Sequence, residues 1–168
     1  MLSTILKLNA WLVKGLELTV MTVMGFLVVD VIWGVFTRYI LHNPASWTEE
    51  LARMLLIWTG LLGASIGVIR KSHLGVDFFV NKLSERYRIV TEMIVYLLIA
   101  VFAGVVLIYG GYRLVSLTLT NSQPSPALHI EWGYVYLALP ISGFFIFIFS
   151  IETVIEKICL LPKKQLNR

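Results

Sequence analysis

The sequence predicts an all-α integral membrane protein with four transmembrane helices, an N-terminal amphipathic interfacial helix and both termini cytoplasmic. The first observation is composition: 58% of the 168 residues are apolar and 14% are charged, with a mean hydropathy of +0.82. Soluble domains are about 45–50% apolar and about 25% charged, so these side chains cannot cover a water-soluble globule. The other two observations are four long apolar runs and an uneven distribution of Lys and Arg.

Each apolar run is long enough to cross the hydrocarbon core, which takes roughly 20 helical residues. Short connections separate the runs, so residues 1–168 form a single membrane domain. Four uninterrupted helices are typical of a scaffold, whereas secondary transporters commonly show internal repeats and interrupted helices. The predicted spans are residues 16–37, 47–69, 91–112 and 132–153.

Residues 1–14 precede the first span and have one polar and one apolar helical face. Ser3, Thr4, Lys7 and Lys14 share the polar face, which predicts a helix lying in the membrane interface. The alternative is a plain cytoplasmic extension of the first span.

Asp30 lies inside the first span, where an ionisable side chain is costly and indicates a function or a buried partner. It could be a coupling residue that binds a proton or a cation. It could instead be structural, either protonated or accepting hydrogen bonds from a facing helix. We favour the structural interpretation, because no second acidic residue lies deep in another span to form a relay.

The second span begins with a helix-start pattern. Ser46 and Glu49 have the spacing of a capping box, and Pro44 lies just before it. Glu49 also precedes Arg53 by four residues, the favourable order for a helical ion pair. This helix should begin outside the hydrocarbon, with Trp47 as an interfacial anchor.

Small residues predict where the helices pack closely. Such residues let helix backbones approach each other in lipid, where apolar burial supplies no driving force. The partner of the stripe in the second span can be another span or another subunit. The stripe consists of Gly60, Gly63, Ala64 and Gly67, and weaker sets are Ala100 with Gly104 and Ala138 with Ser142 near Pro140.

The loop after the second span carries Arg70, His73 and Asp77. His73 and Asp77 are too few ligands for a zinc site, and no nearby Cys or His supplies a third. We therefore predict no metal in this chain and expect the loop to form hydrogen bonds at headgroup level.

The basic residues predict the orientation. Under the positive-inside rule, both termini and the middle loop are cytoplasmic. Orientation and anionic lipid account for this charge, so we predict no nucleic-acid partner. The cytoplasmic set is Lys7, Lys14, Arg70, Lys71, Lys82, Arg86, Arg88, Lys157, Lys163, Lys164 and Arg168, and the remaining basic residues are Arg38, Arg53 and Arg113.

The sequence contains no phosphate-binding loop, zinc-protease motif or nucleophile elbow, so we do not expect an enzyme. Several short motifs in order nevertheless resemble the small membrane subunit of the tripartite ATP-independent periplasmic (TRAP) transporters. The matching residues are Arg38-Tyr39, Asn43-Pro44, Trp47, Glu49-Glu50, Ala52-Arg53, Trp58, Gly63-Ala64, Arg70, His73, Val76-Asp77, Ser125-Pro126-Ala127-Leu128, and Tyr136 with Pro140.

The resemblance implies a subunit of the bacterial inner membrane that forms a heterodimer with a separate large membrane subunit. A periplasmic binding protein delivers an organic acid. The sequence is most similar to the sialic-acid branch of the family, and C4-dicarboxylates are the other common substrates. The large subunit binds sodium and moves as an elevator, while this chain, without a cofactor of its own, is the fixed scaffold. A phospholipid can fill wedges between the long helices.

The resemblance also assigns residues. Trp47, Glu49, Glu50 and Arg53 match the acidic patch of the family, and Arg70, His73 and Asp77 match its loop motif. We expect the outward-facing patch, and the outward-facing loop between the third and fourth spans, to contact the binding protein or the large subunit. That loop segment is Ser125, Pro126, Ala127, Leu128 and His129.

Two alternatives stay open from the sequence. One is a stand-alone small proton-coupled transporter in which Asp30 is the coupling acid. The other is a membrane interaction protein without a role in transport.

Overall fold

The structure is a computed structural model that describes residues 2–70 and 85–163, with side chains described within 11–70 and 87–158. Its described part is built from helices, and its single β-bridge joins Pro124 to Glu131 in a loop. The helices are α1 (Leu2–Tyr39), α2 (Ser46–Ile69), α4 (Glu85–Phe102), the π-helix η1 (Ala103–Gly110), α5 (Gly111–Thr120), α6 (Trp132–Tyr136) and α7 (Ala138–Lys163).

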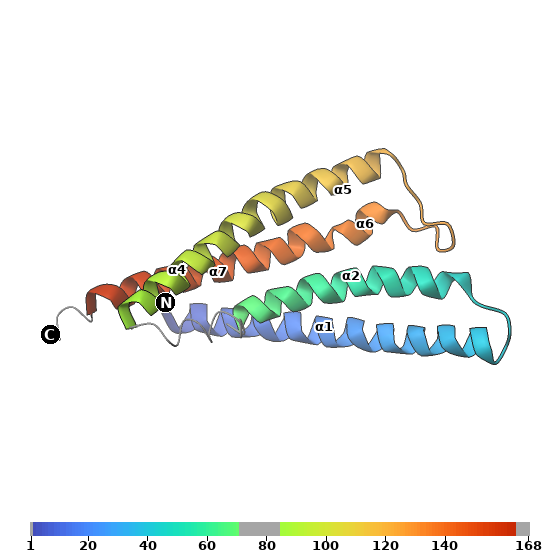
Figure 1. Cartoon of the computed structure of the whole chain (residues 1–168), viewed down its shortest axis with the longest axis horizontal. Helices are drawn as coiled ribbons and strands as arrows, with labels where there is room; N and C mark the ends of the chain where they lie inside the picture. The colour runs from blue at the N-terminus through green and yellow to red at the C-terminus, as the bar shows by residue number, and fades with distance from the viewer. Residues whose placement is uncertain (1, 71–84, 164–168) are drawn as a thin grey trace.

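Four helical stretches in this part of the chain are long and apolar enough to cross a membrane. The prediction of an all-α membrane protein with four spans is therefore confirmed. The first turn of α1 and the last turn of α7 lie at the same end of the molecule (Figure 1), as an even number of spans requires. That this end is cytoplasmic stays a prediction. The four stretches are Trp11–Tyr39, Ser46–Ile69, Tyr87–Thr120 and Trp132–Ile158.

The first two helices differ from the prediction in detail. Helix α1 is continuous from Leu2 to Tyr39, so no break separates the predicted interfacial segment from the first span. Helix α2 begins at Ser46, as expected, but its N-cap is Ala45 and no side chain caps it. The capping-box prediction is therefore wrong, because Glu49 pairs with Arg38 of α1 instead of turning back to the helix start.

The third and fourth spans are not the uninterrupted helices that we expected. The third continues through Thr120, so its last two turns are helical although we had assigned them to the outward loop. Its middle is the π-helix Ala103–Gly110, a form that is rare at this length. The fourth breaks at Leu137, three residues before Pro140, whose ring and missing N–H disfavour a regular helix at this point.

The helices form a row rather than a closed bundle. Among the described elements, α1 packs against α2 alone, and α2 then packs against α7 and briefly against α6. Helix α7 also contacts α4, η1 and α5, which form the other edge of the row (Figure 1). Most of the surface of α1 therefore has no protein neighbour among the described residues.

Close packing is concentrated between α7 and the rod formed by η1 and α5. A Cβ atom built on Gly143 would lie 2.6 Å from Leu107, and one on Gly111 would lie 2.9 Å from Leu139. Ala138 and Ser142, which the sequence analysis had noted, are fully buried in the same region. The set in the fourth span thus lies beside close helix contacts, whereas a Cβ atom on Gly104 would lie 3.4 Å from Phe147, an ordinary contact distance. The closest approach among the described glycines is that of Gly133 in α6, whose Cβ atom would lie 2.5 Å from Leu119.

A polar contact joins α2 to α7 at the centre of the row. Ser65 is completely buried, and its hydroxyl lies 3.1 Å from the carbonyl oxygen of Leu61 and 3.2 Å from that of Ser142. An apolar cluster lies beside it toward the end that holds the termini. It consists of Val68, Tyr96, Ala103, Leu107 and Ile146.

Replacing Gly143 with Ala should destabilise the fold, because the added methyl group would overlap Leu107 and crowd the backbone nitrogen of Ile108. Overpacking of this kind costs typically about 1–3 kcal/mol. Thermal unfolding of the purified chain in detergent measures the change. Gly67→Ala is the matched control, because no atom lies within 4 Å of its Cβ position, and it should be neutral or slightly stabilising. Equal unfolding temperatures for the two variants would contradict the packing described here.

Candidate functional site

Glu50, on the second turn of α2, organises the end of the molecule opposite the first turn of α1 and the last turn of α7. Ser125 donates its hydroxyl hydrogen to this carboxylate. The backbone N–H of Ala127 lies 3.1 and 3.0 Å from the two carboxylate oxygens, and that of Leu128 lies 3.1 Å from one of them. The Glu50 side chain thereby holds the loop between α5 and α6. This contact joins the hairpin of α1 and α2 to the helices that follow.

The loop that Glu50 holds has a compact backbone. The Ser125 N–H donates to the carbonyl oxygen of Ile130 at 2.9 Å, and the His129 N–H donates back to that of Ser125 at 3.0 Å. His129 has a φ of 56° and Ser122 a φ of 40°, left-handed conformations that are uncommon for residues other than glycine. The loop is therefore a preformed surface element at the end of the row.

The predicted contact patch separates into internal and exposed residues. Ser125 is 1% exposed, and its partner Glu50 is half-buried, so both are used inside the chain. Trp47, Arg53 and His129 are exposed. Pro126 is also exposed, whereas Ala127 and Leu128 are half-buried.

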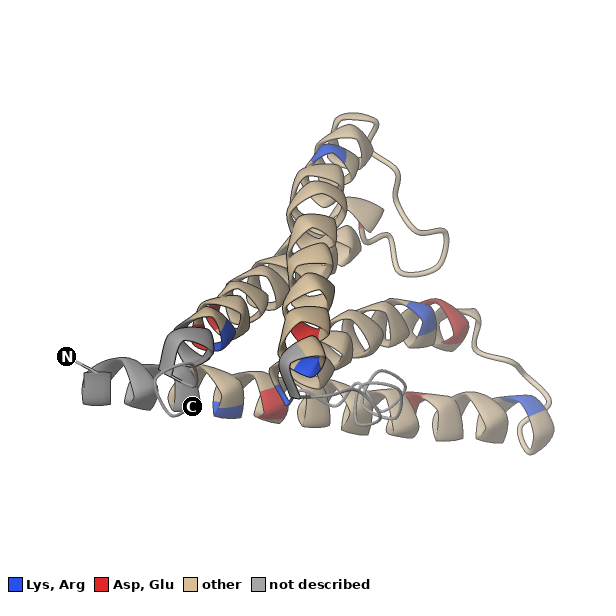
Figure 2. Cartoon of the chain, turned by 60° about the vertical axis from the view of Figure 1, so that its left-hand side comes forward, with Lys and Arg blue, Asp and Glu red and all other residues tan. Residues whose placement is uncertain are grey.

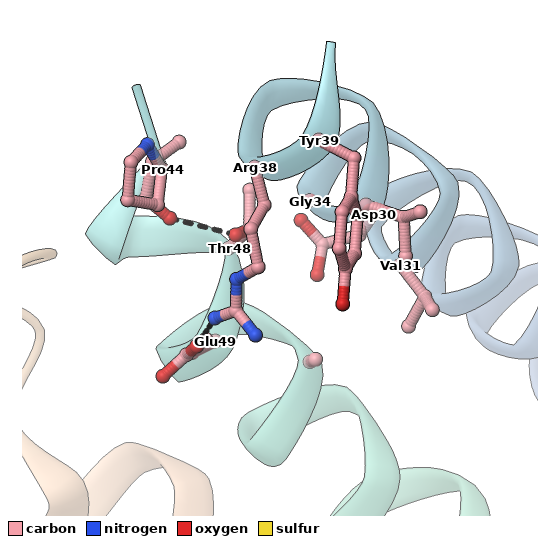
Figure 3. A pocket seen from close by; sticks show the side chains of 11 residues that line it. Asp30, Val31, Gly34, Arg38, Tyr39, Pro44, Thr48 and Glu49 are labelled. Carbon is pink, nitrogen blue, oxygen red and sulfur yellow. Dashed lines mark hydrogen bonds and ion pairs between the residues drawn. The ribbon is translucent and has the colours of Figure 1, made fainter. Parts of the chain in front are cut away.

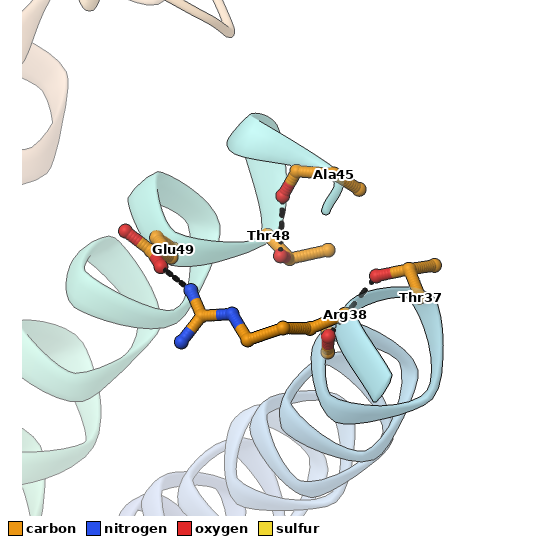
Figure 4. Close-up of polar contacts among 6 residues, drawn as sticks. Thr37, Arg38, Ala45, Thr48 and Glu49 are labelled. Carbon is orange, nitrogen blue, oxygen red and sulfur yellow. Dashed lines mark hydrogen bonds and ion pairs between the residues drawn. The ribbon is translucent and has the colours of Figure 1, made fainter. Parts of the chain in front are cut away.

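Glu49 has a different environment from Glu50. It forms an exposed ion pair with Arg38 across α1 and α2, shown in Figure 4. Beside it, Thr48 is buried and donates its hydroxyl hydrogen to the carbonyl oxygen of Ala45 at 2.7 Å. The predicted pair between Glu49 and Arg53 is replaced by this interhelical contact.

A cleft of about 250 Å³ lies between the C-terminal half of α1 and the N-terminal half of α2. Arg38 and Glu49 stand at it together with Thr48 and Tyr39, and Asp30 lines it from within α1 (Figure 3). Asp30 is 6% exposed, and neither of its carboxylate oxygens has a hydrogen-bond partner among the described residues. The expected hydrogen bond from a facing helix is thus absent from this part of the chain.

Helices α1 and α2 approach each other closely at Gly34, a glycine that the sequence predictions did not include. A Cβ atom on Gly34 would lie 3.0 Å from the hydroxyl oxygen of Thr48. The signal available in the sequence was an isolated glycine one turn after Asp30, which by itself does not distinguish a packed position from an open one. Because Gly34 has no side chain, Thr48 of α2 can lie close to the backbone of α1 at the cleft.

The small-residue stripe of α2 is open. A Cβ atom on Gly60, Gly63 or Gly67 would meet no atom of the described residues within 4 Å, and Ala64 is exposed. The tight contacts inside the chain are made by other glycines, so this stripe does not pack against another described span. The sequence left two partners open for this stripe, another span of this chain or another subunit. Within the described residues, the first of these is excluded.

Ion pairs hold the opposite end of the helices. Arg70 donates to Glu17 at 2.7 and 3.0 Å, which joins the end of α2 to α1. Glu92 of α4 pairs with Lys157 of α7 and with Arg88 at 3.0 Å. Figure 2 shows charged positions near an end of α2 and of α4, and others along α1. Of the predicted loop motif, His73 and Asp77 lie outside the described residues.

The family described as "Tripartite ATP-independent periplasmic transporters, DctQ component" matches residues 27–160. The chain belongs to this family. It is therefore a component of a TRAP transporter, a multi-pass protein of the bacterial inner membrane and not an enzyme. The resemblance noted from the sequence is confirmed.

Three relatives illustrate the match. The small permease protein SiaQ of the sialic acid TRAP transporter of Vibrio cholerae is 26% identical over 86% of this chain and 82% of its own length. The sialic acid TRAP transporter permease protein SiaT of Haemophilus influenzae is 33% identical over 80% of this chain but 20% of its own length. The C4-dicarboxylate small permease protein DctQ of Rhodobacter capsulatus is 30% identical over 58% of this chain and 42% of its own length.

Replacing Glu50 with Ala should open the loop between α5 and α6, because the Ser125 hydroxyl and two backbone N–H groups lose their acceptor. Amide exchange in residues 123–131 should become roughly tenfold faster or more. Hydrogen exchange read by mass spectrometry measures it. Glu49→Ala is the control and should leave this loop unchanged, because its partner Arg38 is exposed and lies on α1. Unchanged protection in the Glu50 variant would contradict a role for Glu50 in holding the loop.

Proposed function

We propose that this chain is the non-catalytic scaffold subunit of a sodium-coupled TRAP transporter and braces a large, elevator-type membrane subunit. The observation that carries the proposal is the open surface of α1 and α2. Helix α1 packs against α2 alone among the described elements, and the glycine stripe of α2 meets no atom of the chain. Small residues on an open face suit a close helix contact with another membrane protein.

A large partner is also supported by the relatives. The match to the permease protein SiaT covers 20% of that protein, so most of its length lies beyond the part that resembles this chain. Such an arrangement is expected if small and large subunits are fused in some relatives and separate in others. Here the large subunit would be a separate chain in a heterodimer, and it would bind the sodium ions and the substrate.

The substrate in this proposal is an organic acid, sialic acid or a C4-dicarboxylate, delivered by a periplasmic binding protein. The relative SiaQ has sialic acid in its name and matches most of both chains, which favours the first substrate. The relative DctQ from Rhodobacter capsulatus has C4-dicarboxylate in its name and matches a shorter segment. The large subunit, which would carry the substrate site, decides between them.

The outward loops supply the surface for the binding protein. Trp47, Arg53, Pro126 and His129 are exposed at the end where Glu50 fixes the loop, so they can meet a docked protein without rearrangement. This role requires that end to face the periplasm. The basic residues near the opposite end support that orientation, with both termini and the motif of Arg70, His73 and Asp77 in the cytoplasm.

Lipid completes the proposed assembly. Helices arranged in a row present wide apolar surfaces, and a phospholipid can fill wedges between them and a tilted partner. The exposed apolar residues of α1, such as Phe26, Val29 and Ile32, suit acyl chains where the large subunit does not cover them.

The second candidate is a stand-alone proton-coupled transporter in which Asp30 carries the proton. The unpartnered carboxyl group of Asp30 is the observation that favours it. Against it, the other acidic residues of the described chain lie at or near the ends of the apolar spans that the sequence predicts, so no relay of carboxyl groups crosses the membrane. The scaffold proposal accounts for the open faces as well and is therefore preferred.

Uptake in proteoliposomes distinguishes the two candidates. The small and large subunits reconstituted together, with the binding protein outside, should accumulate radiolabelled sialic acid under an inward sodium gradient. The small subunit alone should accumulate none, because it has no substrate site of its own in this proposal. Uptake by the small subunit alone under a proton gradient would favour the second candidate, and the same lipid without protein is the blank.

The stripe of α2 can be tested with the double substitution Gly63→Leu and Gly67→Leu. The variant should keep the unfolding temperature of the small subunit within a few degrees, because both positions are open in this chain. It should lose the large subunit during tandem affinity purification. Gly143→Leu is the control for a misfolded chain, because its side chain would enter the contact with Leu107. Loss of folding in the double variant would instead indicate that the stripe packs inside this chain.

A further inference from the structure

Asp30 differs from most polar residues of the membrane spans. The hydroxyl groups of Thr22, Thr59 and Thr118 donate to carbonyl oxygens of their own helix at 2.7–2.8 Å. The Asp30 carboxylate cannot be satisfied in this way, because it needs hydrogen-bond donors and the backbone N–H groups around it already donate within α1. Both of its oxygens are buried without a partner among the described residues. Ser150 is the other described residue whose buried polar atom has no partner, and it carries no charge. Buried polar groups are rarely left so, and each exception calls for an explanation.

The charges around Asp30 are already paired. Arg38 and Glu49 at the edge of the cleft neutralise each other, and Thr48 donates to Ala45. The cleft that Asp30 lines therefore carries one uncompensated acidic group inside an otherwise neutral lining (Figure 3). A cationic group that brings its own hydrogen-bond donors would complement it.

The depth of Asp30 limits where that cation comes from. Asp30 lies eight residues before Arg38 on a continuous helix, which is about 12 Å along the axis at 1.5 Å per residue. Lipid headgroups stay at the interface, near the level of the Arg38 and Glu49 pair. A side chain carried by a neighbouring transmembrane helix reaches this depth directly, and α1 has the free surface for such a helix.

We propose that Asp30 and the cleft between α1 and α2 form a receptor for one basic side chain, Lys or Arg, from a transmembrane helix of the large subunit. A basic residue at that depth in the large subunit would be equally costly without a partner. Each charge compensates the other, so the contact selects the correct partner and fixes the height at which it binds. This inference rests on the proposed function, since it presupposes a large subunit.

The substitution Asp30→Asn tests the receptor, because it removes the charge and keeps the size of the side chain. Truncating or neutralising one member of a buried charge pair weakens association by roughly 30-fold or more. We therefore expect at least that loss in affinity between the small and large subunits, measured by titration in nanodiscs. The unfolding temperature of the small subunit alone should stay the same or rise, because the variant relieves an unpaired carboxyl group.

Glu17→Gln is the matched control. It also neutralises an acidic residue of α1, but Glu17 lies outside the cleft and pairs with Arg70 of this chain, so association should change by less than about threefold. The donor is then found by replacing each Lys or Arg of the large subunit's membrane spans with Met. One such variant should weaken wild-type association as Asp30→Asn does, and combining the two should add little further loss.

Three results would overturn the receptor. Association unchanged in Asp30→Asn, while the wild-type subunits bind normally, would remove it and leave the proposed function standing. A fall in the unfolding temperature of the small subunit with unchanged association would assign Asp30 to the internal fold. Native mass spectrometry that shows an intact variant complex lacking one aminophospholipid would assign the cleft to lipid. Failure of the wild-type subunits to bind at all would instead count against the proposed function.

Discussion

Helices in a lipid bilayer gain little from burying apolar surface, and this constraint determines how the chain is held together. Association must come from close backbone contact and from hydrogen bonds. Both occur along the centre of the row: Gly143 lies against Leu107, and the Ser65 hydroxyl reaches the carbonyl oxygen of Ser142. At the end where α2 begins, the carboxylate of Glu50 joins this helix to the loop after α5. Helices α2 and α7 consequently form the centre on which the outer elements are placed.

The same constraint explains the surfaces that stay open. The glycine stripe of α2 meets no atom of the described residues, so it forms no helix contact within this part of the chain. Helix α1 packs against α2 alone among the described elements, so most of its surface is open to a partner. In a component of a tripartite transporter, both features suit a subunit whose remaining contacts are made by a partner. Asp30 adds an acidic group to these open surfaces, because its carboxyl group has no hydrogen-bond partner among the described residues.

Several residue roles could not be predicted from sequence. Glu49 and Glu50 are adjacent and both acidic, and the sequence analysis placed them in one outward-facing patch. Successive residues of a helix point about 100° apart. One therefore faces α1, where it pairs with Arg38, and the other faces the loop that contains Ser125. The glycines present the same difficulty, since Gly63 and Gly143 look alike in sequence and only the position of the neighbouring helix separates an open site from a packed one.

The four-span membrane fold, the start of α2 and the family follow from the sequence alone, because hydrophobic length and short ordered motifs are local properties of the chain. The structure was needed to show that α1 is one continuous helix, that the third span contains a π-helical segment and extends to Thr120, and that close packing lies between the third and fourth spans. It was also needed to show that Asp30 has no partner among the described residues. These features depend on which faces of distant helices meet, and in a bilayer all of those faces are apolar, so their pattern along the sequence does not specify the pairing.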